Sequence, residues 1–236
     1  MDLKYRRVLI KISGEALSGS LGHGYDFEFV TRVCESVRQC LELGAEIGIV
    51  IGGGNFWRGV KDGAGKVERV SADRMGMLAT AMNCLAVADV FRQTGVKAEV
   101  MTAVDIQGVG ERHDARKADA WLKEGRVVLF GCGTGHPFFS TDTAAVLRAA
   151  EVHADAILLA KNIDGVYTAD PRKDPTALKL DEIRYTEVLS RRLQVMDSTA
   201  TSLAMDNNLP VLVFALADPD NIRRVICGEP VGTYVH

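Results

Sequence analysis

Residues 47–59 read IGIVIGGGNFWRG, a short apolar run that breaks into three glycines and then into aromatic and basic residues. A run that is apolar almost throughout is typical of a strand covered on both faces. Runs of the same kind recur along the chain, and strands are predicted at 7–12, 47–51, 98–102, 126–130, 156–160 and 210–215. Buried strands of this sort are typical of a parallel sheet.

Amphipathic stretches separate the predicted strands, and we expect helices at 27–43, 74–93, 115–123, 143–152 and 199–208. The glycines that follow Leu43 and Thr94 suit helix C-termini. Alternating strands and helices require crossover connections, which place helices on both sides of the sheet. The connection at 162–181, with an Asp-Gly pair and two prolines, predicts a hairpin and an exposed flap. The predicted fold class for residues 1–236 is α/β: a single three-layer αβα domain with a central, mostly parallel sheet.

Composition and charge exclude several classes of protein. The chain has 236 residues, of which 47% are hydrophobic and 25% charged, so a sizeable core is expected and a disordered chain is not. Its 28 Lys and Arg against 31 Asp and Glu give a formal charge of −3. That balance offers no electrostatic basis for a nucleic-acid partner or an acidic membrane.

Cysteine usage and the lengths of the apolar runs indicate a compartment. The five cysteines show no Cys-x-x-Cys spacing, which favours buried, reduced thiols; they are Cys34, Cys40, Cys84, Cys132 and Cys227. No uninterrupted apolar run approaches the ~20 residues that a membrane-spanning helix needs. We therefore expect a cytoplasmic protein without a membrane partner.

The residues that follow four of the predicted strands carry the chemistry. In an open α/β sheet, ligands bind outside the carboxyl ends of the strands. The segments at those ends are KISGEAL (11–17), GGGNFWRG (52–59), GCGTGHPFFSTD (131–142) and KNIDGVYTADP (161–171). Glycines let main-chain N–H groups approach an oxyanion, and Lys11 and Arg58 add full positive charges. Tight turns would explain one such loop, whereas four at the same edge favour a phosphate-binding crevice.

Two familiar nucleotide motifs do not fit. The P-loop pattern fails at GAGKV (63–67), which lacks the first glycine and the hydroxyl and follows no predicted strand. The dinucleotide fingerprint fails at GCGTGH (131–136), which lacks its last glycine. The phosphate site is therefore neither a P-loop nor an ordinary dinucleotide fold by motif.

A combination of motifs resembles one family closely. They are KISGEAL (11–17), IGGGNFWRG (51–59), ADRMGMLATAMN (72–83), GTGHPFFSTDTAA (133–145) and DGVYTADP (164–171). Together they resemble the bacterial-type uridylate kinases of the amino acid kinase superfamily, over residues 7 to 232. GGGN alone indicates only the superfamily, and the blocks at 72–83 and 133–145 narrow the resemblance to the uridylate kinases. The resemblance implies ATP- and Mg²⁺-dependent phosphorylation of UMP to UDP, in pyrimidine nucleotide biosynthesis, by a cytoplasmic homohexamer.

The resemblance also assigns residues to the two substrates. On the ATP side, expected mainly in 151–236 plus the glycine loop after the first strand, it places Lys11, Ile12, Ser13, Gly14, Gly54, Arg58, Lys161, Asn162, Tyr167 and Asp170. On the UMP side, expected mainly in 1–150, it places Gly53, Asp73, Thr134, Gly135, His136, Pro137, Phe138, Phe139, Ser140 and Thr141. Asp73 is the expected acceptor for a ribose hydroxyl, and its alternative role is an N-cap of the following helix. The two phenylalanines are expected to shape the base pocket, with at least one of them in the core.

The implied reaction needs cations more than a base. A phosphate monoester is already substantially dianionic at neutral pH, so catalysis reduces to aligning two anions and neutralising charge between them. We expect Lys11, Arg58 and Asp142 to be the catalytic residues. Asp142 is expected to hold Lys11, with helix capping as the alternative. His113, His136 and His153 lack the spacing of metal ligands, so the only expected metal is Mg²⁺ arriving with the nucleotide.

Two other functions are weighed against this interpretation. One is a superfamily kinase that acts on a carboxylate or carbamate, and the other is a non-catalytic nucleotide or oxyanion store. The block at 72–83 argues against the first, and Lys11, Arg58 and Asp142 argue against the second. The resemblance further implies inhibition by UTP and allows activation by GTP, at a site expected around 88–92 and Arg126. The candidate interface elements are the helix at 27–43 and the helix after Asp73.

Overall fold

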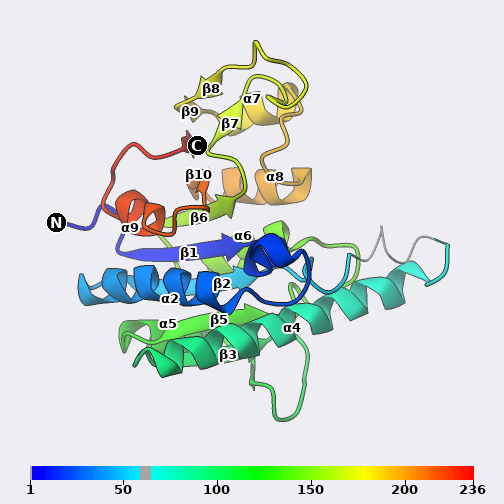
Figure 1. Ribbon diagram of the computed structural model, residues 1–236, viewed down its shortest axis with the longest axis vertical. Helices are drawn as coiled ribbons and strands as arrows, with labels where there is room; N and C mark the ends of the chain where they lie inside the picture. Colours follow the sequence, from blue (N-terminus) through cyan, green and yellow to red (C-terminus); the bar gives the residue numbers. More distant parts are fainter. Residues whose placement is uncertain (1, 59–64) are drawn as a thin grey trace.

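A nine-stranded sheet forms the centre of the described residues, which are 2–58 and 65–236 of a computed structural model (Figure 1). Its strands lie in the order β4-β3-β5-β2-β1-β6-β10-β11-β9. Every neighbouring pair is parallel except β10 and β11. The bounds are β1 Arg7–Ile12, β2 Glu46–Ile51, β3 Ala98–Thr102, β4 Glu111–Arg112, β5 Val127–Gly131, β6 Ala156–Lys161, β9 Glu182–Ile183, β10 Val211–Ala215 and β11 Thr233–Val235.

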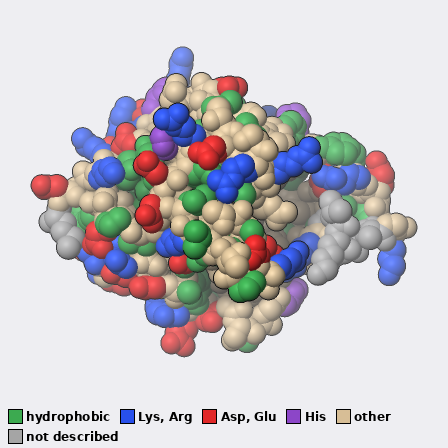
Figure 2. Space-filling view, turned by 90° about the horizontal axis from the view of Figure 1, so that it is seen from above, with side chains coloured by type: hydrophobic (Ala, Val, Ile, Leu, Met, Phe, Trp, Pro, Cys, Tyr) green, Lys and Arg blue, Asp and Glu red, His purple; other side chains and the backbone are tan. Residues whose placement is uncertain are grey.

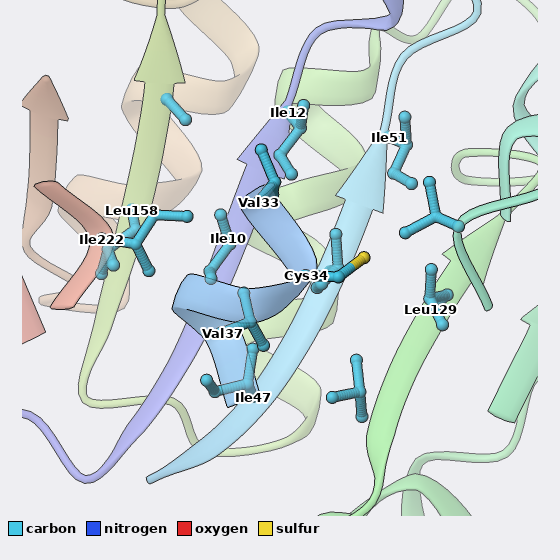
Figure 3. Packing of buried hydrophobic residues seen from close by; sticks show 14 of the residues in the cluster. Ile10, Ile12, Val33, Cys34, Val37, Ile47, Ile51, Leu129, Leu158 and Ile222 are labelled. Carbon is cyan, nitrogen blue, oxygen red and sulfur yellow. The ribbon is translucent and has the colours of Figure 1, made fainter. Parts of the chain in front are cut away.

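Helices cover both faces of this sheet, so the predicted three-layer fold is confirmed. One core cluster packs the sheet against α2 (Phe27–Glu42), α4 (Arg69–Gln93) and α9 (Asn221–Ile226). Figure 3 shows Ile10, Ile12, Ile47 and Ile51 of this cluster beside Val33, Cys34 and Val37 of α2. A second cluster packs the other face against α5 (Ala115–Lys123), α6 (Thr141–Glu151), α7 (Tyr185–Ser190) and α8 (Ser198–Asp206). Two short helices, α1 (Gly14–Leu17) and η1 (Gly19–Leu21), follow β1.

The central strand β1 divides its side chains between the two cores. Val8, Ile10 and Ile12 belong to the cluster under α2, and Leu9 belongs to the opposite cluster. Successive side chains of a strand point to opposite faces, so Lys11 lies on the same face as Leu9. Apolar packing on both sides thus fixes the face from which Lys11 projects.

An ion network anchors the amino end of β1. The Arg7 guanidinium donates to Glu46 Oε2 at 2.6 Å, to Asp119 Oδ1 at 2.7 Å and to the Val152 carbonyl at 2.5 Å. Its side chain is only 11% exposed. Burial opposes the charged form, but the hydrogen bonds to Asp119 and Glu46 outweigh it and raise the Arg7 pKa. Arg7 therefore ties together β1, β2, α5 and the end of α6.

Two predicted helix starts are wrong, each for a local reason. Helix α4 begins at Arg69 rather than at residue 74, because Arg69 and Asp73 form an (i, i+4) ion pair that supports an extra first turn. Helix α6 begins at Thr141 rather than at residue 143, because the Ser140 hydroxyl accepts from the N–H groups of Asp142 and Thr143 and caps it.

The flap predicted after β6 is confirmed as a hairpin. Its strands β7 (Val166–Tyr167) and β8 (Lys179–Leu180) pair antiparallel and lie apart from the main sheet (Figure 1). The glycines expected to end helices also behave as predicted, since Gly44 and Gly95 have positive φ after α2 and α4.

The surface carries mixed charge and one long apolar helix. Seen from above, basic and acidic side chains are interspersed over the molecule (Figure 2). Helix α4 is long and apolar enough to cross a membrane by length and composition, but half of its most apolar window is buried inside the protein. That degree of burial is typical of a core helix.

Candidate active site

Four loops meet at one edge of the sheet. Strands β5, β2, β1 and β6 are consecutive neighbours, and all run parallel. Their carboxyl ends therefore bring together the four segments that carry the predicted chemistry. These strands are packed on both faces by the two core clusters, so the side chains at their ends are presented from rigid elements.

Lys11 and Asp142 form an ion pair at the centre of this edge. Lys11 Nζ lies 2.6 Å from Asp142 Oδ1, and the two side chains are 12% and 17% exposed. Since Ser140 caps α6, the alternative in which Asp142 only caps that helix is wrong. The predicted contact is present, and its carboxylate is free to act on the lysine rather than on the helix end.

A second lysine lies beside this pair. Lys161 ends β6 and its ammonium donates to the Val195 carbonyl. Burial lowers the Lys161 pKa; the charge of Asp142 opposes that shift and the charge of Lys11 adds to it. The crevice thus holds two ammonium groups around one carboxylate, a net positive site.

The glycines of the two neighbouring loops are required by close packing. Ser13 caps α1, and a Cβ on Gly14 would lie 2.5 Å from the Gly52 carbonyl oxygen. A Cβ on Gly53 would lie 2.9 Å from the Gly76 carbonyl oxygen on α4. The loops after β1 and β2 therefore touch each other, and the second also rests directly on α4.

Arg58 lies at the described end of the β2 loop. Its guanidinium pairs with Glu15 on α1 at 2.8 Å and Nε contacts the Gly54 carbonyl at 3.4 Å. Both ionised side chains are more than two-fifths exposed. Arg58 is thus held over the same two loops, with a face open to solvent.

A small cavity beside α4, here named the α4 cavity, holds six of the ten predicted UMP residues. It has a volume of about 130 Å³. The predicted residues that line it are Gly53, Asp73, Thr134, His136, Phe139 and Thr141. Trp57, Gly76, Thr80 and Cys132 complete much of its wall. Burial raises the pKa of the Cys132 thiol to about 11, so the thiol is neutral at physiological pH.

Asp73 has partners that its sequence does not predict. Its carboxylate accepts from Arg69 Nε at 2.8 Å and from the main-chain N–H of Phe138 at 2.7 Å. The N-cap alternative is wrong, because α4 has already begun at Arg69. The Arg69 guanidinium also lies 5.0 Å from the centre of the Phe138 ring. Asp73 therefore joins α4 to the loop that closes the cavity.

Some of the predicted residues in the loop at 134–141 line the α4 cavity, and others lie outside it. Phe138 and Phe139 are 66% and 52% exposed, so the expectation that one of them is core is wrong. Phe139 lines the α4 cavity, whereas Phe138 packs against Arg69 outside it. Gly135 has a φ of +83°, and a Cβ at this position would lie 3.2 Å from the Ala103 carbonyl oxygen; Pro137 lies between His136 and Phe138 in the same loop.

A larger cavity of about 590 Å³ lies under the flap and is here named the flap cavity. All four predicted ATP residues beyond β6 line it, namely Lys161, Asn162, Tyr167 and Asp170. The Tyr167 hydroxyl donates to Asp164 at 2.8 Å, which raises the Tyr167 pKa, and Asp170 accepts from the Arg172 N–H. Arg191 and Arg192 add positive charge to the lining.

The flap cavity is continuous in its walls with a neighbouring hollow of about 460 Å³. The two share Lys161 and the segment at 192–195, and the second hollow reaches Asp142. The walls of these two hollows therefore extend from the flap to Asp142.

Sequence reasoning missed several polar residues that hold these loops. Asp197 accepts from the hydroxyls of Ser140 and Thr143 and caps α8, so it ties α6 to α8. Its signal was the Asp-Ser pair at 197–198, directly before the predicted helix at 199–208, since both residue types are typical N-caps. Asn55 and Asn83 lie in quoted motifs, but no spacing rule predicts that an asparagine after a strand meets one on the next helix.

The comparisons with known proteins agree with this architecture. Residues 6–215 match the model of the amino acid kinase family, and the chain belongs to that family. A solved UMP kinase from Bacillus anthracis is 39% identical with a TM-score of 0.94, over 98% of this chain and 96% of that chain. A UMP kinase from Ureaplasma parvum is 34% identical with a TM-score of 0.92, over 99% of each. A uridylate kinase from Archaeoglobus fulgidus is 26% identical with a TM-score of 0.76, over 97% of this chain and 99% of that chain.

Proposed function

We propose that this protein is a UMP kinase, which transfers the γ-phosphoryl group of ATP to UMP in pyrimidine nucleotide biosynthesis. One observation carries the proposal beyond family membership: Lys11, on the strand between those that carry the two cavities, forms an ion pair with Asp142 of α6. The α4 cavity is built on β2 and β5, the flap cavity on β6, and β1 lies between β2 and β6. A cation at that place is positioned for transfer from one nucleotide to the other.

The residues of this chain supply alignment and charge. UMP brings a phosphate that is already nucleophilic, so no residue has to remove a proton from it. Lys11 stabilises negative charge on the phosphoryl group during transfer, and Asp142 fixes the position of the Lys11 ammonium. Arg58 adds a two-donor grip on phosphate oxygens from the β2 loop. Catalysis by this site is electrostatic.

The two nucleotides divide the chain as the resemblance implies. ATP is assigned to 151–236 with the loop at 11–14, together with Gly54 and Arg58. UMP is assigned mainly to 1–150. In support, the α4 cavity is lined by residues between 53 and 141, and the flap cavity by residues between 161 and 213. In this proposal Tyr167 and Asp170 hold adenosine and the phosphates run toward Lys11.

Mg²⁺ is proposed as the metal that accompanies ATP. Asp142 is the carboxylate at the transfer point, and its Oδ1 faces Lys11. Mg²⁺ usually keeps several waters and binds through one or two carboxylates together with substrate phosphates, so this sparse donor set fits it. When bound, Mg²⁺ would neutralise charge on the phosphates of ATP.

The experiment that tests the proposed function measures ADP release from ATP with a panel of acceptors. UMP should be phosphorylated, and CMP and dUMP should be poor acceptors. Phosphorylation of acetylglutamate or carbamate instead would favour another kinase of the family. Nucleotide binding without ADP release from any acceptor would favour the non-catalytic store.

Asp73→Ala is expected to raise the KM for UMP more than the KM for ATP. The change removes a carboxylate from the wall of the α4 cavity and frees the Phe138 end of its loop. Steady-state kinetics with each substrate varied in turn measure both constants. Asp220→Ala is the matched control, because Asp220 also pairs with an arginine but lies directly before α9. Equal rises in the two constants would remove Asp73 from the acceptor site.

A homohexamer built from dimers is also proposed. Helix α4 exposes an apolar row, here named the α4 stripe: Met75, Leu78, Met82 and Leu85, which are 40%, 52%, 49% and 38% exposed. Their 3-4-3 spacing is that of a helix–helix seam. The exposed Phe27 at the start of α2 is a further candidate contact.

Met82→Glu is expected to lower the molar mass in solution, since it places a charge in the middle of the α4 stripe. Light scattering at micromolar concentration measures the mass. Leu178→Glu serves as the control, because Leu178 is 69% exposed on the flap. A wild-type protein that is a stable monomer under these conditions would contradict the hexamer.

Regulation and location stay predictions. Inhibition by UTP is proposed from the resemblance alone. The expected GTP site contains Arg126 and the fully buried Ala88. Arg126 pairs with Glu99 at 2.6 Å and with Glu124 at 2.8 Å. A triphosphate would have to displace those carboxylates from Arg126. The proposed location is the cytoplasm, and no nucleic-acid or membrane partner is proposed.

A further inference from the structure

Two asparagines form a reciprocal pair beneath the glycine loops. Asn83 Nδ2 donates to Asn55 Oδ1 at 2.7 Å, and Asn55 Nδ2 donates to Asn83 Oδ1 at 3.0 Å. Asn55 is 2% exposed and Asn83 is fully buried. Each amide uses its second interaction on the main chain: Asn83 Nδ2 donates to the Gly52 carbonyl at 2.7 Å and Asn55 Nδ2 to the Gly24 carbonyl at 3.0 Å.

Both phosphate loops rest on this pair. Gly52 begins the glycine loop after β2, so Asn83 fixes that loop to α4. Gly14 of the loop after β1 packs on the same atoms, because its Cβ would lie 2.6 Å from Asn55 Oδ1 and 2.6 Å from the Gly54 nitrogen. The donor-side loop and the acceptor-side loop therefore touch through the Asn55 amide.

Helix α4 extends this arrangement to the loop after β5. One turn before Asn83, the Thr80 hydroxyl accepts from the main-chain N–H of Cys132 at 2.8 Å. Thr80 and Cys132 both line the α4 cavity, whereas Asn55 and Asn83 are not among its lining residues. The asparagines thus act behind the site, through the loops that form it.

Buried polar groups are costly unless every hydrogen bond is made, and a fully satisfied pair specifies one geometry. An apolar pair would fill the same space without fixing the Gly52 carbonyl. Reaction between two bound phosphates depends on their separation, and a displacement of about 1 Å costs on the order of 10² in rate. The fixed feature here is the distance between the two loops.

We propose that Asn55 and Asn83 are positioning residues that set the separation between the ATP phosphates on the loop at 11–14 and the UMP phosphate at Gly53 in the loop after β2. The proposal rests on the proposed function and adds to it residues that touch neither substrate. If the pair is disrupted, the joint binding of the two nucleotides at the correct separation should weaken. The binding of each nucleotide alone should weaken less.

A bisubstrate probe measures that relation without catalysis. The probe is adenosine joined to uridine through a pentaphosphate chain, and calorimetry gives its Kd together with those of ADP and UMP. In Asn83→Ala we expect the Kd of the probe to rise at least tenfold, while the Kd of ADP and of UMP each change less than threefold. We expect kcat to fall by about 10² with both KM values changed little.

A second variant and a control keep the test decisive. Asn55→Ala keeps the Asn83 contact to Gly52. It should therefore raise the Kd of the probe more than those of ADP and UMP, with a smaller effect than Asn83→Ala. It replaces Asn83→Ala in the test if that variant does not fold. Ser36→Ala, on α2, removes the buried hydrogen bond from the Ser36 hydroxyl to the Pro219 carbonyl and should leave every Kd unchanged. Similar losses for the probe and the single nucleotides would overturn the proposal. A wild-type protein that binds neither nucleotide would instead overturn the proposed function.

Discussion

Lys11→Ala is expected to lower kcat by roughly 10²-fold or more, the scale of removing one preorganised charge donor from a phosphoryl-transfer site. The ammonium is held 2.6 Å from Asp142 by packing on a central strand, so no other group replaces it without rearrangement. Single-turnover kinetics with saturating ATP and UMP separate this loss from a loss of binding. The free energy of unfolding should also fall, because the Lys11 side chain is only 12% exposed and its removal leaves Asp142 without this partner.

Asp142→Asn gives the complementary measurement. Ser140 caps α6, so the change should leave the helix intact while weakening the hold on the lysine. We expect a substantial fall in kcat, and a double variant little worse than Lys11→Ala, because groups that act as a unit are not additive. Near-normal kcat in Asp142→Asn would show that the ion pair is only structural.

Arg7→Ala is expected to lower the free energy of unfolding by about 3 kcal/mol, the lower end of the range for breaking a buried ion pair. The lower end applies because Asp119 is 29% exposed, although Glu46 is 12% exposed. The change removes the Arg7 partner of two carboxylates and of the Val152 carbonyl, although Asp119 keeps Lys123 and Glu46 keeps Arg6. Chemical denaturation followed by circular dichroism measures the difference. Arg6→Ala is the matched control: its side chain is 77% exposed and 3.5 Å from Glu46, so a change within about 0.5 kcal/mol is expected.

The pH dependence of this difference follows from Asp119. Hydrogen bonds from Lys123 and then from Arg7 lower the Asp119 pKa in the folded protein. A carboxyl with a lowered pKa contributes stability above its unfolded pKa of about 4 and loses it as the pH falls. The gap between wild type and Arg7→Ala should therefore narrow in acid. A gap that widens there would contradict the assignment.

The sequence predicts the sheet and its crevice because the responsible forces act locally. Apolar runs identify β1, β2, β5 and β6, and the rule for parallel strands then brings their ends together. The contact between Lys11 and Asp142 follows from those two facts. The short strands β9 and β11 were missed, since they have only 2 and 3 residues and show no periodicity.

What the sequence does not predict depends on partners that are distant in the chain. Asp73 suggests a ligand or a cap, and only the fold brings the Phe138 N–H to it. Asn55 and Asn83 are 28 residues apart, and their pairing depends on the packing of α4 against the β2 loop. Polar contacts of this kind carry no periodic signal, so they emerge only from three-dimensional structure.

Strand β1 sets a limit on how the length of this chain can change. Arg7, Leu9 and Lys11 share one face, so the strand links an anchored cation at one end to the crevice cation at the other. Inserting one residue between them would turn Lys11 into the opposite core, and inserting two would shift it by about 6.6 Å. Insertions and deletions among relatives should therefore occur in the connections and not within residues 7–11. An alignment of relatives would show these five positions as a block without insertions.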